Sequence, residues 1–380
     1  MQERIYTNYR LLLPTEEILG TIATYNGIIT DIQPGIVSRG QDGEGNYLLP
    51  GLIELHTDNL EKCFSPRPGV RWNLDAAAVN HDRDLISSGI TTVCDAISIG
   101  DVTPKEDFLR LHHYASMIDA VVKGQAAGRF STNHLLHLRC ELGYEHLYDI
   151  VEPYSQHSLL ALISLMDHTP GQRQFVDTEK YKQYYIEKHG VPKSKMEEFI
   201  SMRLESQRQH AEENRQALVK MSQEKAISLA SHDDATINHI RQAIAEGVIL
   251  AEFPTTIDAA KEAHNNGLQV LMGAPNIVLG GSHSGNVSAM ELVKLDLVDI
   301  ISSDYVPRSL LQSVFIVSQQ ANKPLHEAIK LVTLNSAKAI NLDSEIGSLE
   351  VGKKADFITV HNDGVVPRIL EVFKEGKRVA

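Results

Sequence analysis

Short apolar runs alternate with segments of helical spacing through the middle of the chain. Apolar residues fill these runs on both faces, which is typical of parallel strands covered by helices on each side. Eight such runs predict repeated βα units and a closed (β/α)8 barrel of the α/β class. A doubly wound open sheet is the alternative, and the lack of a Gly-rich phosphate fingerprint after the early strands counts against it. The expected strands are 52–57, 91–96, 135–141, 159–167, 226–231, 248–253, 268–272 and 298–303.

Both ends of the chain carry a different pattern. Short strand-like runs separated by turn residues precede residue 50, and the same pattern returns after residue 352. We therefore expect the two ends, 1–50 and 345–380, to pair into one small composite β domain beside a barrel formed by 51–344.

One segment interrupts the barrel pattern. Residues 172–225 are strongly charged and rich in helix formers, with clear helical spacing at 196–204. A helical excursion of this length after the fourth strand exceeds an ordinary loop, which favours a lid or an oligomer contact. A solvated helix pair without a role in chemistry is an equal alternative.

Composition narrows the function classes. At 380 residues the chain is long enough for one large domain and a smaller one. Its 36 Lys and Arg against 49 Asp and Glu give a net charge of −13, which argues against a broad surface for nucleic acid or an anionic membrane. The first residues lack a signal-peptide pattern and no apolar run approaches a membrane span, so we expect a cytoplasmic protein. Cys63, Cys94 and Cys140 lack CxxC spacing, so neither a disulfide framework nor a zinc ribbon is indicated.

Acidic and imidazole side chains recur where the expected strands end. His56 and Asp58 follow the first strand, and residues two apart on a strand share a face. In (β/α)8 barrels the catalytic groups lie at the carboxyl ends of the strands, so side chains at these ends meet in one site. The repetition of such residues at successive strand ends predicts a metal centre. The other strand-end residues are Asp95, Glu141, His168, His232, Glu252 and Asp304.

This set of ligands suits two divalent ions. We expect one ion at His56, Asp58 and Asp304. A second would lie at His168 and His232, with Glu141 as the bridging carboxylate. Mixed nitrogen and oxygen ligands favour Zn²⁺ or Mn²⁺ over Mg²⁺. For His232 alone, a place at the N-cap of a helix starting within 231–236 is an alternative.

Four segments together resemble the amidohydrolase superfamily over nearly the whole chain. They are Pro-Gly-Leu-Ile-Glu-Leu-His at 50–56, Gly-Ile-Thr-Thr-Val-Cys-Asp at 89–95, Ser-Asp at 303–304 and Gly-Ser-Leu-Glu-Val-Gly-Lys-Lys-Ala-Asp at 347–356. The resemblance implies a distorted (β/α)8 barrel, a composite β domain and a metal-activated water. The chain departs from the family in having Asp58 in place of the second His of a His-x-His pair, and Glu141 in place of a bridging lysine. Its His168 and His232 also fall one strand earlier than the family's histidines.

A narrower resemblance concerns the phosphonate-metabolism branch of that superfamily. It rests on the segments 56–62, 66–72, 139–141, 166–172, 231–234, 252–256, 273–276 and 303–305. It implies a diphosphatase that hydrolyses the α,β phosphoanhydride of α-D-ribose 1-methylphosphonate 5-triphosphate and releases pyrophosphate. Asp304 would be the general base. The expected partner is this phosphorylated small molecule, with no nucleic acid and no membrane, and a homodimer is one option.

A triphosphate substrate needs cationic and hydrogen-bonding groups around the metals. The loop after the first strand provides three basic side chains, and a Gly/Ser-rich loop at 280–286 offers further donors after the seventh strand. The residues expected to bind substrate are Lys62, Arg67, Arg71, Arg173, His283, Asn286, Tyr305 and Arg308. Two rival functions are hydrolysis of a cyclic amide or N-acyl bond, and a non-catalytic metal-stabilised scaffold in a phosphonate-processing assembly.

Overall fold

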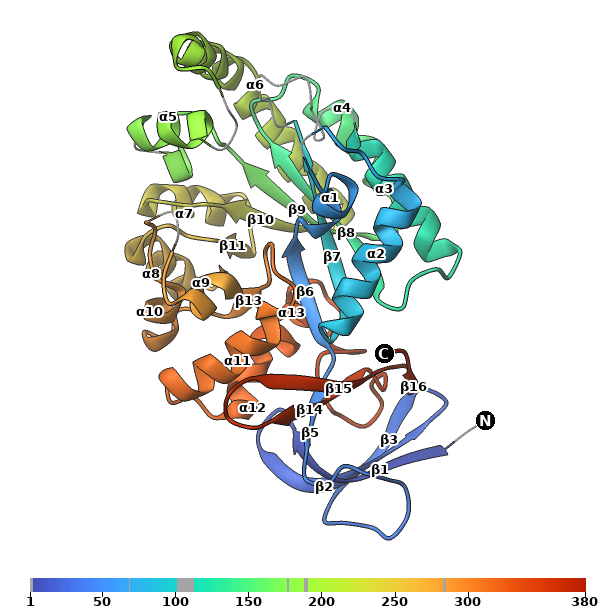
Figure 1. Cartoon of the computed structure of the whole chain (residues 1–380). Coiled ribbons are helices and arrows are strands. Elements are labelled where there is room, and N and C mark those ends of the chain that lie inside the picture. Colours follow the sequence, from blue (N-terminus) through green and yellow to red (C-terminus); the bar gives the residue numbers. More distant parts are fainter. Residues whose placement is uncertain (1–2, 68, 101–112, 176–177, 188–190, 283–284) are drawn as a thin grey trace.

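The computed structural model describes residues 3–67, 69–100, 113–175, 178–187, 191–282 and 285–380. Its main body is a barrel of eight parallel strands that pair with their neighbours in chain order (Figure 1). The predicted barrel is therefore confirmed, and each expected strand is found within a few residues of its predicted bounds. The strands are β6 (Leu52–Thr57), β7 (Ile90–Ile99), β8 (Asn133–Glu141), β9 (Leu160–Met166), β10 (Ser228–His232), β11 (Leu250–Glu252), β12 (Gln269–Gly273) and β13 (Ile300–Ser302).

The barrel closes through side chains where β6 meets β13. The carboxylate of Glu54 accepts hydrogen bonds from the hydroxyl of Ser302 and, at 2.5 Å, from the backbone N–H of Ser303. Thr57 donates its hydroxyl to the carbonyl of Asp304 at 2.8 Å, and the two residues form a parallel bridge. Burial raises the pKa of Glu54 to about 7, against the lowering effect of these hydrogen bonds. The seam thus brings the carboxyl ends of the first and last strands together.

The two chain ends form a second sheet, as the composite β domain required. Its main path runs β16-β15-β14-β5-β1-β2-β3, with β4 pairing on β1. β5 pairs with β14 from the far end of the chain and leads directly into β6. The sheet therefore lies at the amino end of the barrel strands, away from their carboxyl ends (Figure 1). The strands are β1 (Glu3–Leu12), β2 (Glu17–Tyr25), β3 (Ile28–Pro34), β4 (Gln41–Asp42), β5 (Tyr47–Pro50), β14 (Phe357–Asn362), β15 (Pro367–Lys374) and β16 (Lys377–Arg378).

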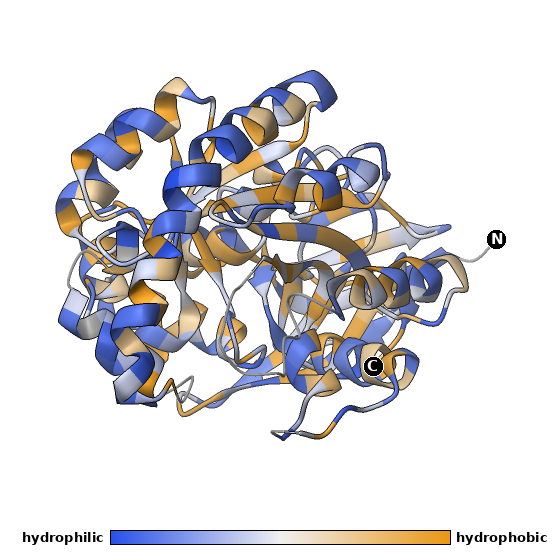
Figure 2. Cartoon of the chain, turned by 90° about the horizontal axis from the view of Figure 1, so that it is seen from above, coloured by the Kyte–Doolittle hydropathy of each residue, from blue (hydrophilic) through white to orange (hydrophobic). Residues whose placement is uncertain are grey.

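Helices cover the outside of the barrel. Seen from above, hydrophobic residues follow the strands and hydrophilic residues predominate on the outer helix surfaces (Figure 2). Several helices begin at a side-chain cap: Thr236 and Thr256 each accept a backbone N–H three residues later. The described helices are α1 (Asn59–Phe64), α2 (Leu74–Ser87), α3 (Tyr114–Ala126), α4 (Leu147–Val151), α5 (Thr178–Glu187), α6 (Met196–Lys225), α7 (Ile237–Ala245), α8 (Ile257–Asn265), α9 (Ala274–Leu279), α10 (Ala289–Lys294), α11 (Ser309–Gln320), α12 (Leu325–Ala328) and α13 (Leu334–Ala339).

Helices α5 and α6 occupy the interrupting segment and lie on the side of the strands' carboxyl ends (Figure 1). Their mutual contact is largely aromatic, with Phe175, Tyr181, Tyr185 and Phe199 in one buried cluster. Helix α6 also binds the barrel, because Asn214 donates its side-chain amide to two backbone carbonyls of the loop after β8. Helix α6 is thus anchored to the barrel, and the role of the excursion as a lid or an oligomer contact stays a prediction.

Candidate metal centre and active site

A buried carboxylate on β11 holds two imidazoles in the barrel. One oxygen of Glu252 lies 2.9 Å from Nδ1 of His56, and the other lies 3.3 Å from Nδ1 of His232. Phe253 packs edge-on against both rings, which are themselves stacked with centroids 5.4 Å apart. A carboxylate that accepts Nδ1–H fixes the tautomer and leaves Nε2 free for a metal ion. Glu252 therefore orients His56 and His232 as a pair.

A second buried carboxylate, Glu141 at the end of β8, holds His168 in the same manner. Its Oε2 lies 2.8 Å from Nδ1 of His168, and its Oε1 accepts the backbone N–H of His168 at 3.0 Å. The same Oε1 accepts a hydrogen bond from Nη2 of Arg203, which reaches in from α6 at 3.0 Å. Through these contacts Glu141 fixes the position and the tautomer of the His168 ring. The bridging role expected for Glu141 stays a prediction.

The oriented imidazoles converge on Asp233, the residue after β10. Its Oδ2 lies 3.4 Å from Nε2 of His232 and 3.7 Å from Nε2 of His168. Two groups of ligand atoms, each within 4.8 Å, therefore overlap at His232: one with His56 and Glu252, the other with His168 and Asp233. His232 ends β10 and Thr236 caps α7, so the helix N-cap alternative for His232 is wrong.

Electrostatics favour a positive charge at this position. Burial by itself lowers the pKa of His168, but the carboxylates of Glu141 and Asp233 outweigh it and raise that pKa to about 10. A field that retains a proton so strongly also attracts a divalent cation. Together with the convergent nitrogen and oxygen atoms, this field fits a metal ion.

Asp304 and Asp58 face each other across the closing seam. Burial, assisted by the negative charge of Asp58, raises the pKa of Asp304 to about 6. Asp58 lies one residue beyond β6, at the start of α1, with Nζ of Lys62 3.5 Å from its carboxylate. Lys62 also donates to the carbonyl of Tyr305 at 2.9 Å and lies 4.9 Å from that ring's centroid. The structure thus groups these predicted residues at one edge of the site.

Three residues within two positions of the ends of barrel strands adopt a left-handed backbone conformation. Asp233, Phe253 and Asp304 have φ of +57°, +53° and +53°. This region is strained for non-glycine residues and costs about 1–2 kcal/mol for each. All three positions border the metal-ligand groups, so the strain turns the chain where the site requires it.

The remaining predicted substrate residues lie further out or have partners. Arg67 and Arg308 are exposed, and Arg71 donates to the hydroxyl of Ser65 at 2.7 Å. Arg173 is buried in an ion pair with Asp234. Asn286 donates its backbone N–H to the hydroxyl of Ser282, and His283 lies outside the described residues.

Asp95 is the clear error among the strand-end residues. β7 continues to Ile99, so Asp95 lies in mid-strand. Its two oxygens accept from His81 on α2 and His134 on β8, both at 2.7 Å. Because Cys94 belongs to the barrel interior, its neighbour Asp95 points outward to the helix layer. It takes no part in the site.

The sequence patterns missed three residues of the site. Glu252 was noted as a strand end but not as the group that orients the histidines, and Asp233 was not singled out. Arg139 was also missed, although it lies two residues before Glu141 on β8 and so shares its face. Strand alternation could have identified Arg139, because a residue two positions before Glu141 on the same strand points to the same face.

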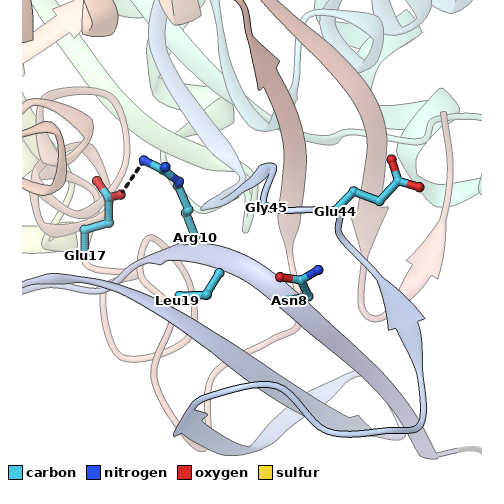
Figure 3. Close-up of a pocket in the computed structure, with 6 residues that line it drawn as sticks. All are labelled: Asn8, Arg10, Glu17, Leu19, Glu44 and Gly45. Atoms are coloured by element: carbon cyan, nitrogen blue, oxygen red, sulfur yellow. Dashed lines mark hydrogen bonds and ion pairs between the residues drawn. The ribbon is translucent and has the colours of Figure 1, made fainter.

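A separate hollow lies on the terminal sheet, at the other end of the molecule. It is lined by Asn8, Arg10, Glu17, Leu19, Glu44 and Gly45, with Arg10 and Glu17 paired at 3.5 Å (Figure 3). It is lined by none of the metal-ligand groups described above. An exposed ion pair such as Arg10–Glu17 contributes little to stability. The chemistry resides in the barrel.

Comparisons with known proteins agree with the barrel fold. The sequence model of the amidohydrolase family matches residues 178–379. Alpha-D-ribose 1-methylphosphonate 5-triphosphate diphosphatase of Escherichia coli (strain K12) is 44% identical over 379 residues, which cover 99% of this chain and 100% of that protein. Among the described helices, none is long and apolar enough to cross a membrane.

Solved structures share the fold at low sequence identity. N-acetylglucosamine-6-phosphate deacetylase from Pasteurella multocida has a TM-score of 0.63 at 15% identity, with 100% of both chains covered. N-isopropylammelide isopropylaminohydrolase from Burkholderia multivorans has a TM-score of 0.66 at 14% identity, covering 100% of this chain and 98% of that one. At such identities the likeness concerns the fold alone.

Proposed function

Because this chain belongs to the amidohydrolase family, we propose that it is a metal-dependent diphosphatase acting on α-D-ribose 1-methylphosphonate 5-triphosphate. The substrate is that in the name of the Escherichia coli relative, which matches this chain from end to end. The observation that carries the proposal is the convergence of His168, His232 and Asp233 beside Asp304, in a field that favours positive charge.

The proposed centre holds two divalent ions, with Zn²⁺ or Mn²⁺ preferred over Mg²⁺ because of the imidazoles. We assign His56, Asp58 and Asp304 to one ion, and His168, His232 and Asp233 to the other. Glu252 orients His56 and His232, and Glu141 orients His168. The role of Glu141 as a bridging carboxylate remains part of this proposal. When bound, such ions polarise phosphoryl oxygens and lower the pKa of water.

The reaction we propose is attack of water on the α-phosphorus. Asp304 accepts the water proton, the new bond forms between the water oxygen and the α-phosphorus, and the bond from that phosphorus to the α,β bridging oxygen breaks. Pyrophosphate leaves with the electron pair of that bond, and ribose 1-methylphosphonate 5-phosphate remains. The raised pKa of Asp304, about 6, suits a base that is ionised near neutral pH yet basic enough to take a proton.

Basic side chains at the rim are proposed to hold the leaving pyrophosphate. Lys62, Arg67, Arg71 and Arg308 surround the loops after the first and last barrel strands and are partly or fully exposed. Tyr305, Asn286 and His283 belong to the same proposed group. Arg173 is a weaker candidate because Asp234 already compensates its charge.

The remaining parts of the proposal concern organisation and setting. The composite β domain comprises 1–50 and 345–380, the barrel comprises 51–344, and the helical excursion spans about 172–225. The protein acts in the cytoplasm on a phosphorylated small molecule, without nucleic acid or membrane as partner, and a homodimer is compatible with this role.

Phosphorus NMR tests the proposal directly. Protein loaded with Mn²⁺ or Zn²⁺ is incubated with the ribose methylphosphonate triphosphate, and ATP is followed in a parallel tube. We expect pyrophosphate and a 5-phosphate to appear selectively from the methylphosphonate compound. Inertness toward both, with turnover of a cyclic or N-acyl amide, would favour the amide hydrolase; inertness toward all with no bound metal would favour a scaffold.

A further inference from the structure

Arg139 is a cation of the barrel interior that the reaction above does not use. On β8, the side chains of Leu135, His137, Arg139 and Glu141 share one face because strand residues alternate. Leu135 belongs to the interior hydrophobic cluster, His137 bonds to Ser164 across the interior, and Glu141 contacts His168. Arg139 therefore faces the interior, one step below the metal-ligand level.

The guanidinium of Arg139 has no partner within the part of the chain that the structure describes. The residue is 9% exposed, and its Nε is buried without a hydrogen-bond acceptor. Three other buried arginines each have a carboxylate: Arg173 pairs with Asp234, Arg203 with Glu141, and Arg215 with Glu246. Among the residues that the structure describes, no carboxylate or hydrogen-bond acceptor binds Arg139.

Burying a cation without a partner costs desolvation free energy, and an anion that binds to the cation offsets this cost. The charge of Arg139 acts on the reactive groups. Burial is the main cause of the raised pKa of Asp304 and of the lowered pKa of His232, and Arg139 opposes the first shift and adds to the second. An anion bound to this guanidinium would therefore lie within reach of the proposed general base. Lys62 and Arg71, in contrast, lie near the rim and have contacts of their own.

We propose that Arg139 forms an oxyanion subsite that binds the non-bridging oxygens of the phosphoryl group under attack. This inference rests on the proposed function and names the group that compensates the α-phosphoryl charge. The planar guanidinium can donate to two oxygens of one phosphoryl group at once, which a lysine cannot do in the same geometry. The rim cations bind the terminal phosphates, so the two sets of cations have separate tasks.

Kinetics of three Arg139 variants and one control variant test the assignment. Arg139→Met and Arg139→Lys should lower kcat by about 10²–10³-fold, the loss typical of one oxyanion-binding donor, with a smaller change in KM. Arg139→Ala should regain part of its kcat when guanidinium is added. Arg129→Met is the matched control, because Arg129 precedes the same strand, is exposed and pairs with Asp75; its kcat should equal that of the wild type.

Binding of inorganic phosphate gives a readout independent of turnover. Calorimetry on the Mn²⁺-loaded protein should show at least about tenfold weaker phosphate binding by Arg139→Met, with unchanged metal content by elemental analysis. Unchanged phosphate affinity, or unchanged kcat in an active enzyme, would overturn the subsite. Loss of metal from both Arg139→Met and Arg139→Lys would also overturn it, since Arg139 would then support the ligands. A wild type that binds phosphate through Arg139 but releases no pyrophosphate would refute the proposed function and leave the subsite standing.

Discussion

Replacing Arg203 by methionine tests whether helix α6 is part of the active site. The Arg203 guanidinium and the Glu141 carboxylate are both buried, at 4% and 1% side-chain exposure, and lie 3.0 Å apart. Breaking a buried pair by removing one partner costs roughly 3–5 kcal/mol when the other charge is left alone. Glu141 retains two contacts to His168 at 2.8 and 3.0 Å, so a loss nearer the value of one charged hydrogen bond is expected. We expect Arg203→Met to lower the free energy of unfolding by about 2–3 kcal/mol.

Urea unfolding monitored by circular dichroism measures this loss. Arg208→Met is the matched control on the same helix, because Arg208 has 75% side-chain exposure and pairs only at the surface with Glu205. Its effect should stay within about 0.5 kcal/mol. A double variant with Glu141→Gln should lose less than the sum of the two single losses, since each single change removes the same interaction.

The site should respond as well. Without Arg203, Glu141 holds His168 less firmly, so metal affinity should fall by about tenfold, the lower limit for loss of a group that orients a ligand. An Arg203→Met protein with wild-type stability and wild-type metal affinity would refute this role of Arg203. Helix α6 would then cover the barrel without supporting the active site.

Three further predictions concern the buried ion pairs of His134, the orientation of the metal-binding histidines by Glu252, and the proposed general base Asp304. Burial lowers the pKa of His134, but the carboxylates of Asp95 and Asp82 outweigh it and raise the pKa to about 9. This raised pKa contributes roughly 3 kcal/mol of stability that is fully present below about pH 6.5 and is lost as pH rises through 9. In His134→Gln, the urea midpoint should therefore vary less with pH between about 6.5 and 9. A pH dependence equal to that of the wild type would contradict the prediction. Glu252→Gln should weaken metal binding by about 10–100-fold in a chelator competition, and an unchanged affinity would exclude its orienting role. Asp304→Asn should retain the native circular dichroism spectrum and lose pyrophosphate release by about 10²-fold or more; full activity would remove Asp304 as the base.

The periodicity of the chain determined the architecture. Parallel strands buried on both faces require continuous apolar runs, and βα connections require helical spacing between them, so strand number and order followed from the sequence. The pairing of the two ends followed in the same way, from a recurring strand-and-turn pattern. The carboxyl-end rule for barrels then indicated His56, His168, His232 and Asp304 as site residues.

Only the tertiary structure decided what each polar residue does. Asp95 and Glu141 both follow the pattern of an acid near a strand end. However, β7 continues beyond Asp95, and alternation with the interior Cys94 points Asp95 outward to α2, whereas Glu141 ends β8 and faces the interior. Sequence spacing does not state where a strand stops, and an error of a few residues changes the level and the face of a side chain. That limit explains the misplacement of Asp95.

Charge partners depend on contacts between distant segments, which a single sequence does not reveal. Arg173 and Arg139 are alike as residues near strand ends, but folding provides Asp234 for the first and no carboxylate for the second among the described residues. Arg203 reaches Glu141 across 62 positions of sequence. The sequence thus determined the fold and the set of residues whose side chains can bind metal, transfer a proton or carry charge. Packing decided which of the charges are already compensated and which remain available to a substrate.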